Sequence, residues 1–182
     1  FVKIRKYSWK SSAGREEEAS LSEADRLLSA GRWEAAQALY TEVLKKEPKA
    51  SSAHFGLGTI AFHQGRYAEA AKHLGQVEPG APGSADLSKM MALLWFELAP
   101  LPDLMAARKR LAEDPGDGAA HLARGLAYAK GRQYEPALEE LMKAMEADPP
   151  AREGEAKDAF LKIIEILGRE SEIGRRFMLR LS

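Results

Sequence analysis

The sequence contains no cysteine among its 182 residues. This absence excludes disulfide bonds, thiolate nucleophiles, redox-active cysteine pairs and cysteine-ligated zinc within the chain. Net charge is also absent, because 27 Lys and Arg balance 27 Asp and Glu, whereas dedicated nucleic-acid binders carry a basic excess. No run approaches the ~18 apolar residues that a membrane-spanning helix requires. We therefore expect a soluble protein that neither binds nucleic acid nor inserts into a membrane. We assign it to the cytoplasm, although the absence of cysteine fits reducing and oxidising compartments alike.

Short motifs that mark catalytic and cofactor sites are missing too. The sequence has no HExxH, GxSxG, glycine-rich phosphate loop, GxGxxG or EF-hand pattern. The glycines of GLGTIA (Gly56 to Ala61) fall inside a predicted helix, where they favour close packing rather than phosphate binding. We expect no enzyme, and we assign no catalytic, cofactor-binding or metal-binding residue.

An internal repeat is the main positive feature of the sequence. Three segments align: GRWEAAQALYTEVLKKEP from Gly31, GRYAEAAKHLGQVEP from Gly65 and GRQYEPALEELMKAMEADP from Gly131. Their shared anchor is an aromatic residue followed three positions later by alanine, at Trp33/Ala36, Tyr67/Ala70 and Tyr134/Ala137. The first two anchors lie 34 residues apart and the next gap is 67, which predicts a degenerate unit at about residues 84–116.

This period and pattern resemble the tetratricopeptide repeat (TPR), a helix–turn–helix unit. The position where the two helices of a unit approach most closely holds a small residue in each copy, at Ala24, Gly58 and Gly125. The glycine of the last copy, Gly131, stands one residue out of phase with Gly31 and Gly65. We predict an all-α, right-handed TPR-type superhelix (solenoid) of antiparallel helix pairs at about residues 17–47, 51–77, 84–113 and 118–147.

The regions outside the repeats differ from them in composition. Residues 1–16 form a basic arm with no acid before Glu16, which we interpret as a linker rather than a binding patch. The repeats span residues 17–151, and residues 152–182 are predicted to form capping helices. The first of these carries Phe160, Ile163, Ile164 and Leu167 on one face, as expected of a helix that covers the apolar end of a solenoid.

The candidate functional residues are histidines and residues of helix A, the first helix of each repeat. His54 and His121 occupy equivalent positions in their repeats, which favours packing over metal ligation. Positions of helix A that usually face the concave groove hold Leu21, Asp25, Leu28, Phe55, Thr59, Phe62, Leu122 and Leu126. TPRs that clamp a peptide carboxylate need Lys and Asn where Leu21, Asp25 and Gly56 stand, so that ligand is rejected. An apolar groove suits hydrophobic segments or a partner helix, although its side chains could equally cover one another.

The C-terminal part carries a more specific resemblance. The segments LAEDPGDGAAHLARGLAYAKGRQYEPALEELMKAMEADP, GEAKDAFLKIIEILG and RRFMLRL follow one another over residues 111–181. This order is similar to the C-terminal TPR region of the chaperedoxins, bacterial co-chaperones with a thioredoxin-like domain. The resemblance covers residues 17–182 and implies binding of unfolded clients and hand-over to a chaperonin. It also places the chaperonin contact on the terminal helix, at Ile173, Arg175, Arg176, Phe177, Arg180 and Leu181.

The sequence departs from the chaperedoxins in two ways. No thioredoxin domain precedes the repeats in these residues, and the chain stops at Ser182, slightly short of the family's apolar tail.

Two alternative functions remain open. The first alternative is a generic TPR scaffold in an envelope, secretion or regulatory complex. The second is an enzyme regulator or a self-assembling TPR joined through Phe177 and Leu181. The sequence does not predict an oligomeric state.

Overall fold

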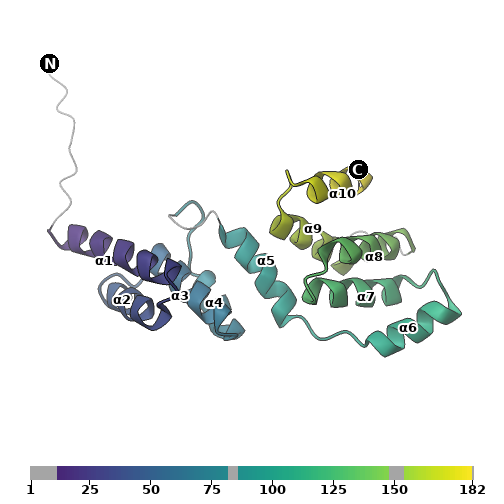
Figure 1. Cartoon of the computed structure of the whole chain (residues 1–182), viewed down its shortest axis with the longest axis horizontal. Helices are drawn as coiled ribbons and strands as arrows, with labels where there is room; N and C mark the ends of the chain where they lie inside the picture. Colours follow the sequence, from purple (N-terminus) through teal and green to yellow (C-terminus); the bar gives the residue numbers. More distant parts are fainter. Residues whose placement is uncertain (1–11, 82–85, 148–153, 182) are drawn as a thin grey trace, which may run out of the picture. The chain divides into compact units, whose positions relative to one another are not determined.

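The computed structural model describes residues 12–81, 86–147 and 154–181 (Figure 1). Across those residues the chain forms ten α-helices and no strand, so the predicted all-α class is confirmed. The chain divides into two compact units, unit 1 from Phe1 to Leu87 and unit 2 from Ser88 to Ser182. Most of the predicted basic arm, residues 1–11, lies outside the described residues, and the first helix already begins at Ser12.

Unit 1 consists of two helix pairs. The first is α1 (Ser12–Ser29) with α2 (Trp33–Lys46), and the second is α3 (Ser51–His63) with α4 (Tyr67–Leu74). Each helix packs on the next in the chain, and α1 also contacts α3. The turn within each pair is the same, because Gly31 and Gly65 share a φ of +72°, a value that a residue without Cβ adopts without strain.

The core of unit 1 is built on small residues at the predicted close contacts. Ala24 and Ala36 are fully buried between α1 and α2. A Cβ on Gly58 would lie 2.7 Å from Leu74 Cγ, so only glycine lets α4 approach α3 this closely. The predicted register of these two repeats is therefore confirmed at its tightest points.

Unit 2 holds the last repeat and the helices that follow it. The pair α7 (Gly118–Lys130) and α8 (Tyr134–Ala147) packs against α9 (Glu155–Leu167), and α10 (Glu172–Leu181) lies against α8 and α9. The shared core includes Leu138, Leu141 and Phe160, each fully buried. A Cβ on Gly125 would lie 2.9 Å from Leu141 Cγ, which places this glycine at the close contact predicted for it.

The predicted degenerate unit differs from the other pairs. Its helices are α5 (Leu87–Leu98) and α6 (Leu104–Glu113), joined by a linker that contains Pro100 and Pro102. Although every residue of both helices is described, they do not pack along each other as α1/α2, α3/α4 and α7/α8 do. α6 packs on α7, while α5 adds Ala92 and Phe96 to the core of α7, α8 and α9.

Candidate functional site

The predicted groove residues of unit 1 come from α1 and α3, which contact each other. Leu21, Leu28, Phe55 and Thr59 are half-buried, and Asp25 is exposed. Phe62 is only 7% exposed, and its ring packs against those of His63 and Tyr67, with centroid distances of 5.9 and 5.6 Å. Phe62 therefore packs beneath this surface, whereas the side chains of the other five residues are partly or fully exposed on it.

Asp25 has a structural role that the sequence did not reveal. The hydroxyl of Tyr40, on α2, donates a 2.6 Å hydrogen bond to Asp25 Oδ1. The Tyr40 ring is fully buried and occupies the space over Gly56, where a Cβ would lie 2.3 Å from ring carbons. Burial, and then the Asp25 carboxylate, raise the pKa of Tyr40 far above its ordinary value. Gly56 thus makes room for a tyrosine that ties α2 to the groove-facing side of α1.

The groove residues predicted from the sequence did not include one aromatic pair of unit 1. The Trp33 ring, at the start of α2, stacks on His63 at the end of α3, with centroids 5.6 Å apart and planes 22° apart. Trp33 is half-buried and His63 is exposed, so one face of this pair meets solvent. The equivalence of Trp33 with Tyr67 and Tyr134 predicted a repeat anchor at this position, but not its stacking partner.

The remaining groove candidates lie on α7, in unit 2. Leu122 is half-buried, and Leu126 is 9% exposed and belongs to the core beside Leu141. Both belong to unit 2, whereas the other six predicted groove residues belong to unit 1. Of the two, Leu122 has the larger area to offer a partner.

The predicted partner helix, α10, is fixed by its central aromatic residue. Phe177 is fully buried and meets Phe160 of α9 edge-on, with ring centroids 6.4 Å apart. The guanidinium groups of Arg176 and Arg180 lie over the same ring at 5.0 and 5.1 Å. Phe177 therefore anchors α10 to the unit and is not available to a partner while the helix is docked.

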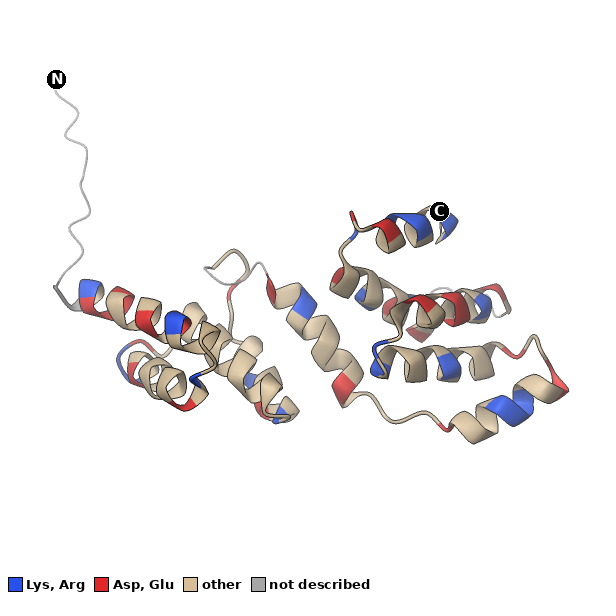
Figure 2. Cartoon of the chain, in the orientation of Figure 1, with Lys and Arg blue, Asp and Glu red and all other residues tan. Residues whose placement is uncertain are grey.

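Two of the predicted arginines are also engaged within the chain. Arg176 pairs with Glu135, and Arg180 pairs with Glu139 at 2.6 Å, both acids being on α8. Figure 2 marks basic residues on the ribbon of α10 and acidic residues on the ribbon of α8. Because all four side chains are between 42% and 50% exposed, solvent screens both pairs and each contributes little to stability.

The outward face of α10 contains residues that the sequence prediction only partly included. Ile173 and Leu181 are half-buried, whereas Arg175 is exposed and Leu179 is 78% exposed. A shallow hollow of about 420 Å³ is lined by Arg169, Glu170, Arg175, Met178 and Leu179. This mixed apolar and basic face, rather than the Phe177 side, is the accessible part of the helix.

A polar cluster in the last repeat collects three donors on one carboxylate. Glu140, on α8, is only 5% exposed. It accepts hydrogen bonds from Arg124 at 2.6 and 2.8 Å, from His121 Nδ1 at 2.8 Å and from Lys143 at 3.2 Å. Burial raises the pKa of Glu140, but these three partners outweigh burial and hold the pKa at about 2.

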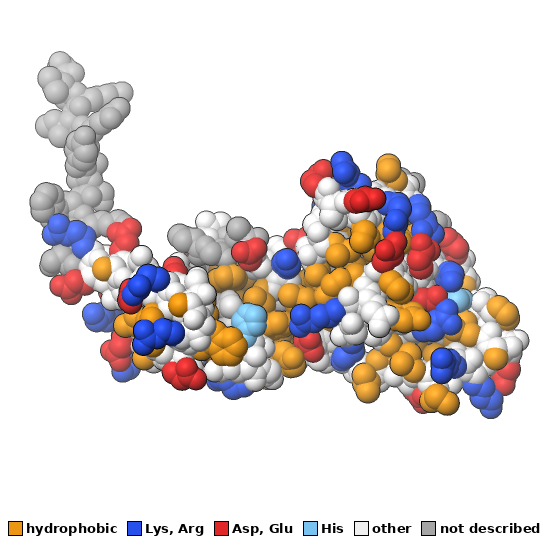
Figure 3. All heavy atoms as spheres, in the orientation of Figure 1, with side chains coloured by type: hydrophobic (Ala, Val, Ile, Leu, Met, Phe, Trp, Pro, Cys, Tyr) orange, Lys and Arg blue, Asp and Glu red, His pale blue; other side chains and the backbone are white. Residues whose placement is uncertain are grey.

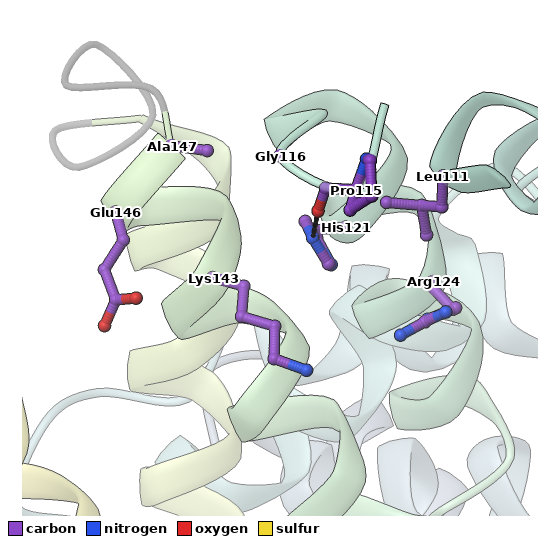
Figure 4. Close-up of a pocket in the computed structure, with 8 residues that line it drawn as sticks. All are labelled: Leu111, Pro115, Gly116, His121, Arg124, Lys143, Glu146 and Ala147. Carbon is purple, nitrogen blue, oxygen red and sulfur yellow. Dashed lines mark hydrogen bonds between the residues drawn. The ribbon is translucent and has the colours of Figure 1, made fainter. Parts of the chain in front are cut away.

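The same cluster borders a second hollow in unit 2, with a volume of about 570 Å³ against about 420 Å³ for the hollow beside α10. Its lining includes His121, Arg124, Lys143, Leu111, Pro115 and Glu146, whose side chains are drawn in Figure 4. His121 Nε2 lies 2.9 Å from the Pro115 carbonyl oxygen, so each ring nitrogen faces an oxygen acceptor. The ring can donate to both oxygens only when it carries two protons and a positive charge.

Repeat two contains the counterpart of this histidine. His54 Nε2 lies 3.0 Å from the Pro48 carbonyl oxygen, and His54 Nδ1 lies 3.1 Å from His73 Nδ1. The partner stands 19 residues after the histidine in both repeats, as His73 and as Glu140. Burial, and then the neighbouring His54, lower the pKa of His73. These contacts agree with the predicted packing role of His54 and His121.

Among the described residues, no group of three His, Asp or Glu side chains is placed to hold a metal ion. In the same residues, no helix combines the length and the apolar character needed to cross a membrane.

Comparison with known proteins identifies the repeats. Tetratricopeptide-repeat models match residues 21–85 and residues 97–182. No curated protein matches the chain. Among solved structures, MamA from Desulfovibrio magneticus RS-1 (41-end) is 21% identical and has a TM-score of 0.41, with 91% of this chain and 94% of that chain covered. A thermophilic TPR protein of Thermus thermophilus is 20% identical and also has a TM-score of 0.41, with coverages of 91% and 89%.

TPR domains generally mediate protein–protein interaction and are typically non-catalytic scaffolds. The two matched segments lie on either side of the boundary between the units and include all or part of every helix from α1 to α10. The chain therefore belongs to the tetratricopeptide-repeat family.

Proposed function

We propose that this chain is the protein-binding part of a thioredoxin-like co-chaperone, and that it holds unfolded clients and contacts a chaperonin through α10. The observation that carries the proposal is the way α10 is presented. Phe177 and two arginines fix one side of the helix to the unit, while Arg175, Met178 and Leu179 border a hollow on the other. A docked helix of this kind offers a preformed surface, so little conformational entropy is lost when a partner binds.

The unit 1 surface suits the binding of unfolded clients. Leu21, Leu28 and Phe55 are half-buried apolar side chains on adjacent helices, and Asp25 supplies a polar edge. Exposed segments of an unfolding protein are apolar and extended or helical, and a shallow apolar groove can accept either form. This surface is therefore the part of unit 1 that we assign to clients.

The chaperonin contact is tested with two variants matched in chemistry. Arg175→Glu with Leu179→Asp changes the outward face of α10, while Arg32→Glu with Ala38→Asp changes an exposed basic and an exposed apolar residue of unit 1. Binding of each purified protein to purified chaperonin is measured by biolayer interferometry. We expect loss of binding in the first variant and retention in the second. Equal binding by both variants, or no binding by the unmodified chain, contradicts the proposal.

Client binding is tested separately by light scattering of a heat-labile protein. We expect the unmodified chain to suppress aggregation, and Phe55→Asp to reduce that suppression. If the chain binds neither chaperonin nor client, the alternative is favoured, a TPR scaffold in an envelope, secretion or regulatory complex.

A further inference from the structure

Exposed apolar side chains are concentrated in one short stretch of the chain. Among the described residues, six large apolar side chains are strongly exposed, and five of them fall within the 15 residues from Met91 to Met105. We call these five the 91–105 patch: Met91, Leu98, Leu101, Leu104 and Met105, with exposed fractions of 41, 52, 82, 45 and 73%. Figure 3 shows hydrophobic side chains gathered over the α6 end of this stretch. Four of the five lie within the eight residues from Leu98 to Met105, and exposed apolar surface that is contiguous marks interaction sites, unlike scattered single residues.

The patch is exposed because its two helices do not form a pair. In the other repeats, the second helix packs back on the first and covers its apolar face, as Leu141 does over Gly125. α5 keeps a small, buried residue at the corresponding position, Ala92, but α6 does not pack along it. Each helix therefore presents apolar side chains that a paired repeat would cover.

Contacts within unit 2 hold the two helices in this unpaired arrangement. The end of α5 is fixed where Lys130 Nζ donates to the Ala99 carbonyl oxygen, and the Lys162 ammonium lies 4.9 Å from the Trp95 ring centroid. α6 is fixed on α7 by the buried Ala107 and by the pair between Arg110 and Asp117 at 2.6 Å. Pro100 and Pro102 restrict the linker backbone between them, since each proline fixes its own φ and disfavours helix in the residue before it.

We propose that the 91–105 patch is a self-association surface, on which a second copy of this chain supplies the helix that each of α5 and α6 lacks. The second copy is the occupant because it carries both missing partners: a first helix built like α5 and a second helix built like α6. The contact would continue the helix-pair interface that the chain already forms three times, in α1/α2, α3/α4 and α7/α8. In a two-fold arrangement, α5 of each copy pairs with α6 of the other, so every unpaired helix gains a partner. No unpaired face is left for a third chain, and the assembly closes as a dimer.

Because both copies contribute the same patch, a two-fold interface buries twice the apolar surface of one patch. Five exposed side chains per copy become ten at a two-fold interface. A stable interface buries about 1,200–2,000 Å² in total, and its fully buried centre is more apolar than the rest of the surface. Leu101 is the most exposed of the five and stands at the midpoint of the linker between α5 and α6, so we place it near the two-fold axis in the proposed dimer.

The first test is the mass of the full chain in solution. Sedimentation equilibrium from low to high micromolar concentration is expected to show a monomer–dimer equilibrium. Leu98→Glu with Met105→Glu is expected to leave only monomer. Leu179→Glu, at the one strongly exposed large apolar residue of the described chain outside the patch, is expected to keep the dimer. A monomer at every concentration overturns the proposal, as does a dimer that Leu179→Glu dissociates and the double variant does not.

The second test exploits the absence of cysteine in the chain. Leu101→Cys and Leu179→Cys each introduce the only thiol at sites of nearly equal exposure, 82% and 78%. Under mild oxidation, Leu101→Cys is expected to form a disulfide-linked dimer much faster than Leu179→Cys. Equal rates show random collision rather than association through the patch and overturn the proposal. Circular dichroism of each variant confirms that its helices are retained.

Discussion

At the scale of single residues, backbone conformation and close contacts follow the repeat register. The position two residues before the anchor aromatic needs a positive φ, and it holds Gly31 and Gly65 in the first two repeats. In the last repeat the glycine is one residue early, at Gly131, and Arg132 takes the left-handed conformation with a φ of +58°. Because the glycine of the last repeat is displaced by one residue, an arginine occupies the position that requires a positive φ and is strained there.

Replacing Arg132 by glycine is expected to stabilise unit 2 by about 0.5–1 kcal/mol. The change removes the left-handed strain of an L-residue, and part of this gain is offset by the greater freedom of glycine in the unfolded chain. The ion pair of Arg132 with Glu97 is 4.0 Å long and the arginine side chain is 64% exposed, so its loss costs little. Urea unfolding measures the difference; a lower midpoint for Arg132→Gly contradicts the prediction.

Gly125→Leu is expected to destabilise unit 2 by about 1–3 kcal/mol, as overpacking does. The first added atom already meets Leu141 Cγ at 2.9 Å and the Ala137 carbonyl oxygen at 3.3 Å, so α7 and α8 must separate. Ala119→Leu, at an exposed position of the same helix, is the control and is expected to change stability by less than about 0.5 kcal/mol. Thermal unfolding compares the two; equal melting temperatures contradict the assigned register.

At the scale of helices, what each element can offer a partner depends on which of its faces the fold has used. α10 has Phe177 in the core and Arg176 and Arg180 on α8, which leaves Arg175 and Leu179 outward. The sequence predicted a terminal helix with Phe177 among its partner contacts, but apolar residues lie on both of its faces, Phe177 on one and Leu179 on the other. Only the tertiary contacts decide which of the two is buried.

Phe177→Ala is expected to release α10 and to cost about 3–5 kcal/mol at its docking site. The lost contacts include the Phe160 ring and both arginine groups stacked on Phe177. Hydrogen exchange is expected to rise in residues 172–181, while α7 and α8 stay protected. Leu179→Ala is the control, because its side chain is 78% exposed. Unchanged exchange in Phe177→Ala contradicts the anchoring role.

At the scale of the whole molecule, the two units have separate cores and different titrating groups. The core of unit 1 surrounds Tyr40 and Ile60, and that of unit 2 surrounds Leu141 and Phe160. Equivalent positions of the two units carry His73 in one and Glu140 in the other. The same structural site therefore responds to pH in different ranges in the two units.

Lowering the pH from 7 to 5 is expected to destabilise unit 1 before unit 2. Because the pKa of His73 is lowered in the folded chain, the unfolded chain takes up the proton first, and stability present above pH 6.5 is lost below it. The pKa of Glu140 is lowered from 4.5 to about 2, so its contribution is kept until the pH falls below 4.5. Besides His54, the charged groups that act on His73 are Glu69, Lys72 and Arg66.

Tryptophan fluorescence separates the two transitions. With Trp9 replaced by Phe, a variant that retains Trp33 reports on unit 1 and one that retains Trp95 reports on unit 2. The Trp33 transition is expected to move to lower temperature between pH 7 and 5, and His73→Gln is expected to remove much of that shift. A Trp95 transition that moves first or equally over this range contradicts the prediction.

The sequence by itself determined the features that depend on neighbouring residues and on the 34-residue period. These are the helices, the small residues at Gly58 and Gly125 where paired helices meet, and the turns at Gly31 and Gly65. Local propensity and apolar periodicity encode all of them, because each involves residues within one repeat.

Tertiary structure decided what depends on contacts between repeats. It separated α5 from α6, although the spacing of the anchors predicted a fourth helix pair there. It brought Arg124 and His121 onto Glu140, 16 and 19 residues away in the sequence. It also buried Phe177 and exposed Leu179. Such choices follow from which surfaces meet in three dimensions, and a periodic pattern along one chain does not specify them.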